Sequence, residues 1–260
     1  MTQIQEKPNF DEISNLIGQL PDYPAFETTA NDPMTRITEW LSHYSQTLDL
    51  SRGFLVNRCA LYWAGYNMVD GFSGQKFVDA CEDASGSLRQ LAQILDTDLQ
   101  IFELDPTNTT KPSLEELAMA ASYGMMAIEE GTQLFCACSF GQGVSVAAAD
   151  ALEKTDDFTN IQNFMAENCG LDHAAMLGSV LACLLKGIPV ILEGTSGKLI
   201  KTLLEKETGK QWDSIIIAEE LNLFLNHDTP GHQMITAAIM LKTIYTANLK
   251  SDCGKIKRAA

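Results

Sequence analysis

LFCACSFGQGVSVAAADAL, residues 134–152, passes from an apolar run through two glycines in G-x-G spacing into a segment of small residues. The apolar run predicts a buried strand, and the small residues after it predict a helix. Glycines at such a junction let the backbone approach a phosphate, and the free amides of a helix N-terminus can bind it. The stretch lacks the third glycine of a dinucleotide fingerprint and the lysine of a P-loop, so a plain strand-to-helix turn is an equal alternative.

The same alternation of strands and helices extends along the rest of the chain. Strands are predicted over 58–65, 98–105, 132–139, 188–194 and 213–220. Helices are predicted over 9–18, from residue 33, over 75–95, over 114–130, after residue 143, and over 173–187, 198–209 and 231–249. Because the strands are nearly continuous in apolar residues, they indicate a parallel sheet that is covered on both faces. The predicted fold class is α/β: a Rossmann-like parallel sheet with helices on both faces, and N-terminal helices packed on it.

The length and composition predict one large folded unit. The 260 residues are 45% hydrophobic, which is enough for a sizeable core. Residues 1–50 are predicted to form an N-terminal helical segment, and residues 51–260 an α/β domain. No internal repeat, low-complexity tract or linker interrupts the pattern.

The charge and the lack of targeting signals limit the possible partners. A formal net charge of −16 argues against nucleic acid or an anionic membrane as a partner. No apolar run reaches the roughly 18 residues that predict a membrane span. The start, MTQIQEKPNF, is polar and has no signal-peptide core. The expected location is therefore cytoplasmic.

The cysteines predict packing rather than metal binding. Seven cysteines, an odd number, fit reduced thiols in a chain without a secretory signal. Cys136 and Cys138 lie two apart in the predicted strand, so both point to one face, where free cysteine behaves as a small hydrophobic residue. The other cysteines and the four histidines show no zinc-finger spacing, and no metal site is predicted.

Ligands of parallel α/β sheets bind beyond the carboxyl ends of the strands, so the residues after each strand carry the functional information. Besides the opening stretch, EGTSGK at 193–198 follows a strand and offers two glycines and two hydroxyl groups. It is either a second phosphate loop or the capped start of a helix. Asp172 begins another helix, where its charge either lines the cleft or only favours the helix dipole.

Several of these segments resemble one enzyme family in the same order along the chain. GLDHAAMLGSVLACLLKGIPVILEG (170–194) is similar to the pattern G-G-x-E-I-A-A-L-A-G…G-I-P-V-x-L-D-G of nicotinate-nucleotide:dimethylbenzimidazole phosphoribosyltransferases. CALYWAGYNMVDGFS (59–73) and SLEELAMAASYGMMAIEEG (113–131) stand where that family has a strand with A-G-D-H-G-V and a capped helix ending in E-A-G. CSFGQGVSV (138–146) stands at its G-E-M-G-I-G-N-T-T loop, and DSIIIAEELNLFLNHDTPGH (213–232) at a strand followed by S-A-E-P-G-H.

The resemblance spans residues 30–235 and implies a function. The family transfers phosphoribose from nicotinate mononucleotide to a benzimidazole-type or related aromatic base, a step of cobamide lower-ligand synthesis, and needs no metal or organic cofactor. A homodimer is implied as well, and the small residues of 173–187 would permit close helix approach. The substrate- and phosphate-binding residues indicated by the strand ends and the resemblance are Tyr66, Ser73, Ser139, Gly141, Gly143, Ser145, Asp172, Glu193, Gly194, Thr195 and His232.

The proton acceptor of such a transfer must differ from that of the family. The family's catalytic glutamate lies in a G-E-G-T-G-A motif after P-G-H, and no such motif occurs in this sequence. Asp228 and His227, beside the retained P-G-H, are the candidate catalytic residues, since a carboxylate next to an imidazole can accept a proton. The alternative is a turn in which Asp228 caps the last helix. Two further hypotheses stay open: an inactive homologue that binds a nucleotide, an aromatic base or a partner protein, and a different small-molecule enzyme on the same scaffold.

Overall fold

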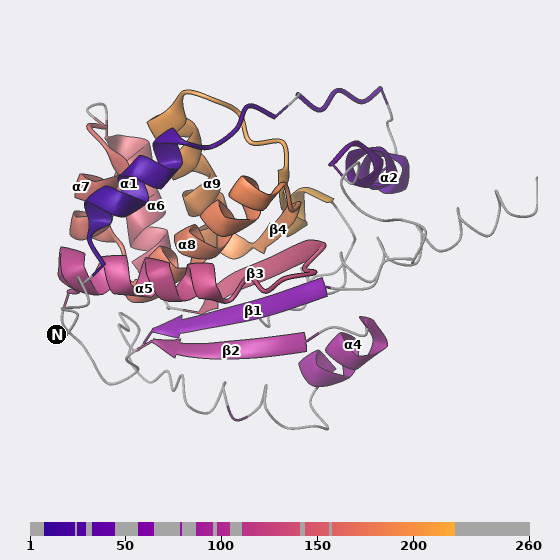
Figure 1. Cartoon of the computed structure of the whole chain (residues 1–260), viewed down its shortest axis with the longest axis horizontal. Helices are drawn as coiled ribbons and strands as arrows, with labels where there is room; N and C mark the ends of the chain where they lie inside the picture. The colour runs from indigo at the N-terminus through magenta and orange to yellow at the C-terminus, as the bar shows by residue number, and fades with distance from the viewer. Residues whose placement is uncertain are drawn as a thin grey trace, which may run out of the picture.

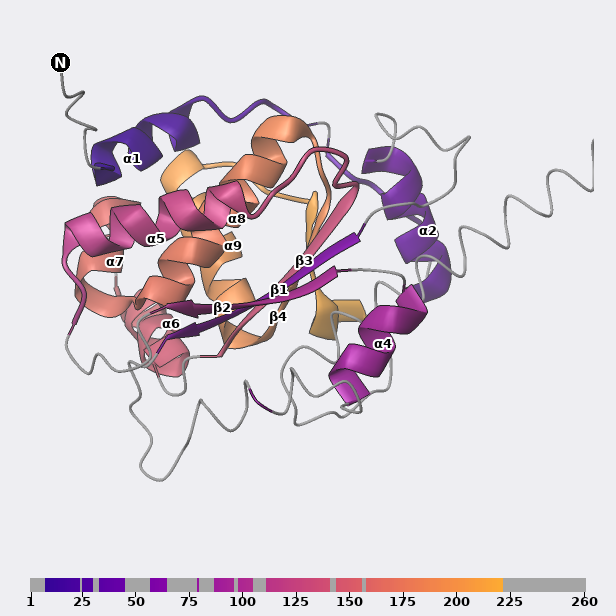
Figure 2. The same ribbon diagram turned by 60° about the horizontal axis from the view of Figure 1, so that its bottom comes forward.

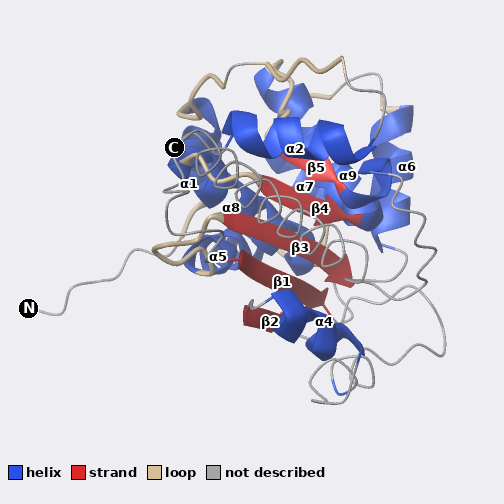
Figure 3. Cartoon of the chain, turned by 90° about the vertical axis from the view of Figure 1, so that its right-hand side faces the viewer, coloured by secondary structure: helices blue, strands red, loops and turns tan. Residues whose placement is uncertain are grey.

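Five strands form one parallel sheet in the computed structural model (Figure 3). The structure describes residues 8–23, 25–29, 33–44, 57–64, 79, 87–95, 98–104, 111–140, 144–155 and 158–221. The strands are β1 (Asn57–Ala64), β2 (Asp98–Leu104), β3 (Leu134–Phe140), β4 (Val190–Glu193) and β5 (Ile215–Ile217), in the spatial order β2-β1-β3-β4-β5. The predicted parallel α/β sheet is confirmed.

Described helices lie on both sides of this sheet, with α4 (Ser87–Leu95) beside β2 on one side and most of the others on the opposite side (Figures 1 and 2). The described helices are α1 (Phe10–Gly18), α2 (Pro33–Tyr44), α4, α5 (Leu114–Met126), α6 (Val144–Lys154), α7 (Ile161–Asn168), α8 (Leu171–Lys186) and α9 (Gly194–Thr208), and a 3₁₀ turn, η3 (Ala218–Leu221), follows β5. The connection from β1 to β2 runs toward one edge of the sheet, and the later connections run toward the other. Right-handed crossovers therefore place α4 on one face and α5, α8 and α9 on the opposite face.

The helices α5 and α8 pack with their backbones nearly in contact. A Cβ at Gly178 of α8 would lie 1.9 Å from the carbonyl oxygen of Ala121, and a Cβ at Gly124 of α5 would lie 1.9 Å from that of Ala175. The Ser179 hydroxyl donates to the Gly124 carbonyl at 2.8 Å across the same contact. The small residues of 173–187 thus serve packing within the chain, which corrects their expected use between subunits.

The N-terminal helices pack on the sheet domain, as predicted. Phe10, Ile13 and Ile17 of α1 are buried in the same cluster as side chains of β3 and β4. Trp40 of α2 is buried, and its indole N–H donates to the carbonyl of Asp213 just before β5 at 2.6 Å. A buried indole needs such a partner, so this bond fixes α2 near the β5 edge.

Two predicted helix boundaries were wrong. The predicted helix 114–130 has its expected Ser113–Glu116 capping box but ends at Met126. There the amides of Ala127 and Ile128 bond to carbonyls three residues back, which tightens the last turn and buries Ile128. The predicted helix 198–209 begins four residues earlier, at Gly194, so EGTSGK is mostly helix rather than loop.

One helix was missed, and another lies outside the described residues. Helix α7 was not predicted from the sequence, although Asn160 caps it and Ile161, Phe164 and Met165 bury one face. The predicted helix 231–249 and most of 75–86 are not described. Within the described ranges, no helix has the length and apolar character that crossing a membrane requires.

Candidate functional site

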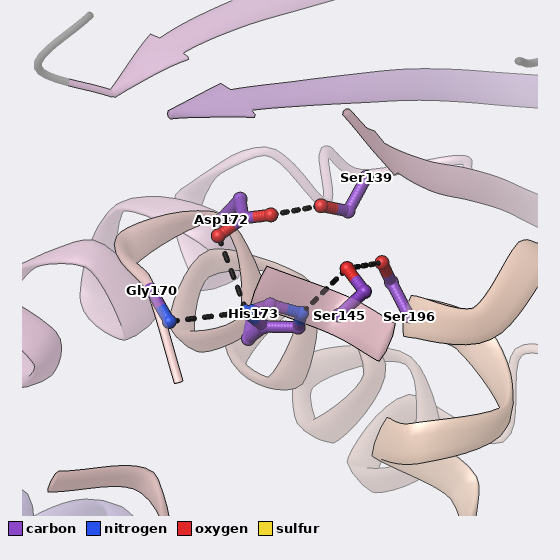
Figure 4. Close-up of polar contacts among 6 residues, drawn as sticks. All are labelled: Ser139, Ser145, Gly170, Asp172, His173 and Ser196. Carbon is purple, nitrogen blue, oxygen red and sulfur yellow. Dashed lines mark hydrogen bonds and ion pairs between the residues drawn. The ribbon is translucent and has the colours of Figure 1, made fainter. Parts of the chain in front are cut away.

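Polar side chains from four elements meet beyond the carboxyl ends of β3 and β4 (Figure 4). The two strands end side by side, since Cys138 of β3 pairs with Glu193 of β4. Ser139 lies near the end of β3, and Ser145 lies in the first turn of α6. Asp172 and His173 lie in the first turn of α8, and Ser196 lies in the first turn of α9. This is the sheet edge at which parallel α/β folds bind ligands.

The Asp172 carboxylate is buried but well supplied with hydrogen bonds. The Ser139 hydroxyl donates to Oδ2, and the backbone N–H of His173 donates to the carboxylate as well. Burial alone raises the pKa of this carboxyl, whereas the hydrogen bonds from the Ser139 hydroxyl and from the backbone N–H of His173 lower the pKa by favouring the charged form. Gly170 makes room for it, because a Cβ there would lie 2.6 Å from Oδ1. Asp172 is therefore ionised at neutral pH.

The position of the ring hydrogen on His173 follows from the backbone of Gly170. The Gly170 N–H is directed at Nδ1 over 3.1 Å, so this nitrogen is an acceptor and carries no hydrogen. Asp172 Oδ1 lies 3.2 Å from the same nitrogen, but no hydrogen lies between these two atoms, because the Gly170 amide already occupies the Nδ1 lone pair. With Nδ1 accepting from the Gly170 amide, the ring hydrogen lies on Nε2.

The Nε2–H of His173 determines what Ser145 can do. Nε2 lies 3.0 Å from Ser145 Oγ, which must accept this hydrogen. Ser145 Oγ lies in turn 2.6 Å from Ser196 Oγ. The two hydroxyls carry one hydrogen each, and only one of these hydrogens can lie between the two oxygens. Whichever serine donates to the other, one O–H hydrogen is left for a ligand, so the pair is a hydrogen-bond donor.

A serine, a histidine and an aspartate in contact also form the nucleophilic triad of serine hydrolases. In that triad the imidazole donates from Nδ1 to the aspartate and accepts the serine proton at Nε2. Here the bond from Gly170 imposes the opposite tautomer, and Nε2 already carries a hydrogen. The arrangement therefore orients hydroxyl groups rather than activating one as a nucleophile.

Two further carboxylates lie at this edge. Glu193, the last residue of β4, is buried. Glu219 follows β5 in η3, and its Oε1 accepts the backbone N–H of Gly194 at 2.6 Å. The amide of Gly194 is therefore occupied by a carboxylate, and a phosphate would have to use the hydroxyl pair and other amides. Among the described residues, no cluster of His, Cys, Asp or Glu side chains is suited to holding a metal ion.

The structure brings together part of the predicted site. Ser139, Ser145 and Asp172 join one hydrogen-bonded network, and Glu193 and Gly194 lie beside it. Thr195 is exposed, and its neighbour Ser196 contacts Ser145 instead. The remaining candidates lie outside the described residues: Tyr66, Ser73, Gly141, Gly143, His227, Asp228 and His232.

His173 is a residue of the network that was not predicted from the sequence as part of the site. It is fully buried in a helix that is otherwise rich in small and apolar residues. A polar side chain in such a run must find partners, so its presence alone is a signal. Ser196 was noted as a hydrogen-bond donor, but its burial depends on where α9 begins.

Comparison with known proteins places this geometry on a known fold. No protein-family model matches the chain, and no curated protein matches its sequence. A solved structure of nicotinate-nucleotide-dimethylbenzimidazole phosphoribosyltransferase from Thermus thermophilus covers 90% of this chain and 94% of its own, with a TM-score of 0.62 and 16% identity. A structure of CobT from the same organism covers 90% and 95%, with a TM-score of 0.63 and 15% identity.

The chain has the CobT fold. The resemblance predicted from residues 170–194 is thereby confirmed at the level of the fold. The Ser145–Ser196 pair and Asp172 lie beyond the ends of β3 and β4, the edge at which parallel α/β folds bind ligands.

Proposed function

We propose that this protein is a phosphoribosyltransferase that moves phosphoribose from nicotinate mononucleotide to a benzimidazole-type or related aromatic base in cobamide lower-ligand synthesis. The CobT fold supports this reaction class. One observation supports the phosphate-bearing substrate: the Ser145–Ser196 hydroxyls meet between the N-termini of α6 and α9 with one hydrogen left to donate. Hydroxyl donors at two positive helix ends suit a phosphate.

The carboxylates around the hydroxyl pair suit the other half of the substrate. Nicotinate mononucleotide has a cationic ring, and breaking its bond to ribose spreads positive charge over the sugar. Asp172, Glu193 and Glu219 place negative charge at the same edge of the sheet. Preorganised charge of this sign lowers the energy of a cationic transition state. The site therefore combines donors for an anion with carboxylates for a developing cation.

The first test is product formation. Incubated with nicotinate mononucleotide and 5,6-dimethylbenzimidazole, the protein is expected to release nicotinate and α-ribazole phosphate, identified by mass spectrometry. Nicotinate riboside is the matched control donor, because it lacks the phosphate that the hydroxyl pair would hold, and it should give little product. Binding of nicotinate mononucleotide without any product would instead support the inactive homologue, and equal use of both donors would contradict a phosphate site.

We also propose a homodimer. Met119, Tyr123 and Met126 are exposed on α5 at helical spacing, with 44%, 45% and 72% of their surfaces accessible. This stripe offers an apolar surface for a symmetric contact between two copies. Light scattering at micromolar concentration is expected to give twice the single-chain mass of 28.5 kDa. A mass that stays at the single-chain value would contradict the dimer.

A further inference from the structure

Glu219 has one carboxylate oxygen in use and one without a partner. Oε1 accepts the Gly194 N–H at 2.6 Å. Oε2 is buried and has no hydrogen-bond partner within the described structure. Buried polar atoms are nearly always paired, and an unpaired charged acceptor is especially unfavourable. Oε2 therefore lacks a donor that a bound molecule can supply.

We propose that Glu219 is a catalytic residue whose Oε2 takes the acidic ring hydrogen of the aromatic acceptor. This proposal rests on the proposed phosphoribosyl transfer. Glu219 follows β5 at the ligand edge, and Gly194, which it contacts, lies two residues before Ser196 in the first turn of α9. At about 1.5 Å of rise per residue, Gly194 and Ser196 are close along the helix axis. One nucleotide-sized ligand can therefore reach both the Glu219 carboxylate and the Ser196 hydroxyl.

The surroundings of Gly194 leave space for a ligand. Gly194 has a φ of +78°, a conformation that favours glycine, and a Cβ built on it would meet no atom of the described residues within 4 Å. Open space therefore adjoins the residue that Glu219 holds in place. The bond from Gly194 also fixes the carboxylate, so that Oε2 keeps one position as a proton acceptor.

The other carboxylates at this edge are less suited to the role. Asp172 already accepts hydrogen bonds from the Ser139 hydroxyl and from the backbone N–H of His173. Glu193 has an interaction of its own. Among the described carboxylates at this edge, Glu219 has a buried oxygen without a hydrogen-bond partner.

The step balances with the two substrates alone. The unprotonated ring nitrogen of the benzimidazole attacks C1′ of nicotinate mononucleotide with its lone pair. The bond from C1′ to the nicotinate nitrogen breaks, and its electron pair neutralises the pyridinium. The N–H hydrogen on the other nitrogen of the benzimidazole passes to Glu219 Oε2. The products are nicotinate, α-ribazole phosphate and a protonated Glu219, which later returns its proton to water.

Glu219→Gln tests this assignment with a matched pair of acceptors. The amide oxygen can still accept from Gly194, while an NH₂ group replaces Oε2 and cannot take a proton. With 5,6-dimethylbenzimidazole, kcat is expected to fall about 100-fold or more, the usual effect of removing a general base. With 1-methylbenzimidazole, which has a free ring nitrogen but no N–H to lose, kcat should change little.

The controls separate this proposal from the proposed function. Glu220→Gln, at the exposed neighbouring residue, should leave both acceptors unaffected. Nicotinate mononucleotide affinity, measured by calorimetry, should be the same in the Glu219 variant and verifies its fold. An equal loss with both acceptors, or no loss with either, overturns the role of Glu219 alone. If the unchanged protein forms no product from either acceptor, the proposed function fails, and this assignment fails with it.

Discussion

Replacing Gly178 by alanine is expected to lower the free energy of unfolding by about 3 kcal/mol, the upper part of the usual range for overpacking a core. The new Cβ would lie 1.9 Å from the carbonyl oxygen and 2.6 Å from the carbonyl carbon of Ala121. These are backbone atoms, so no change of side-chain rotamer can relieve the clash. The helices α5 and α8 would have to separate, although nearly all of α8 is buried.

Thermal unfolding provides the measurement for this variant. A loss of about 3 kcal/mol corresponds to a decrease in Tm of roughly 6–12 °C in a protein of this size. Gly18→Ala is the matched control: a Cβ there meets no atom of the described residues within 4 Å, so its Tm should stay near that of the unchanged protein. An unchanged Tm for Gly178→Ala would show that the two helices are not as close as the structure has them.

Gly178 also shows how a sequence signal can predict the correct type of contact but the wrong partner. Glycine in a helix interior is about 1 kcal/mol less favourable than alanine, so it indicates that something lies close to the helix. The small residues of 173–187 did predict a close helix approach. Sequence alone could not say whether the neighbour was a second copy or, as found, α5 of the same chain.

The elements that were predicted well are those set by local chemistry. The capping box of Ser113 and Glu116 joins residues three apart, and β3 is recognised from one continuous apolar run. The boundary of α9 depended on distant residues. Its first turn lies against β4, where a Cβ at Gly197 would come 2.7 Å from Leu192 Cβ, and this packing turns a loop-like sequence into helix.

The site was predicted in part because its bonds join residues far apart in sequence. Ser139 and Asp172 are 33 residues apart, and Ser145 and Ser196 are 51 apart. The rule that ligands bind at strand ends selected Ser139 and Ser145 correctly. Choosing Ser196 over Thr195 required the rotation of α9, which follows from where that helix begins.

The Ser145–Ser196 pair makes a prediction about non-additivity. Ser145→Ala leaves Ser196 with its own hydrogen, no longer shared with the other serine and free for the phosphate. Ser196→Ala leaves Ser145, which still accepts from His173 and can donate its hydrogen to the ligand. Each single variant therefore retains one O–H donor, and each is expected to weaken nicotinate mononucleotide binding by less than about tenfold.

The double variant Ser145→Ala, Ser196→Ala retains no hydroxyl donor at this point. Binding is expected to weaken by about 100-fold or more, beyond the product of the two single effects, because hydrogen bonds to a charged group contribute about 1.5–3 kcal/mol.

Calorimetric titration of the four proteins of this double-mutant cycle with nicotinate mononucleotide supplies the measurement. Ser122→Ala is the matched control, since that hydroxyl only donates to the Ala118 carbonyl within α5. Additive single effects would mean that the two hydroxyls contact the ligand independently. A double variant that binds as the unchanged protein does would place the phosphate elsewhere. A larger-than-additive loss is what the tautomer of His173 requires, because with Nε2 protonated the two serines share two hydrogens and can spare only one.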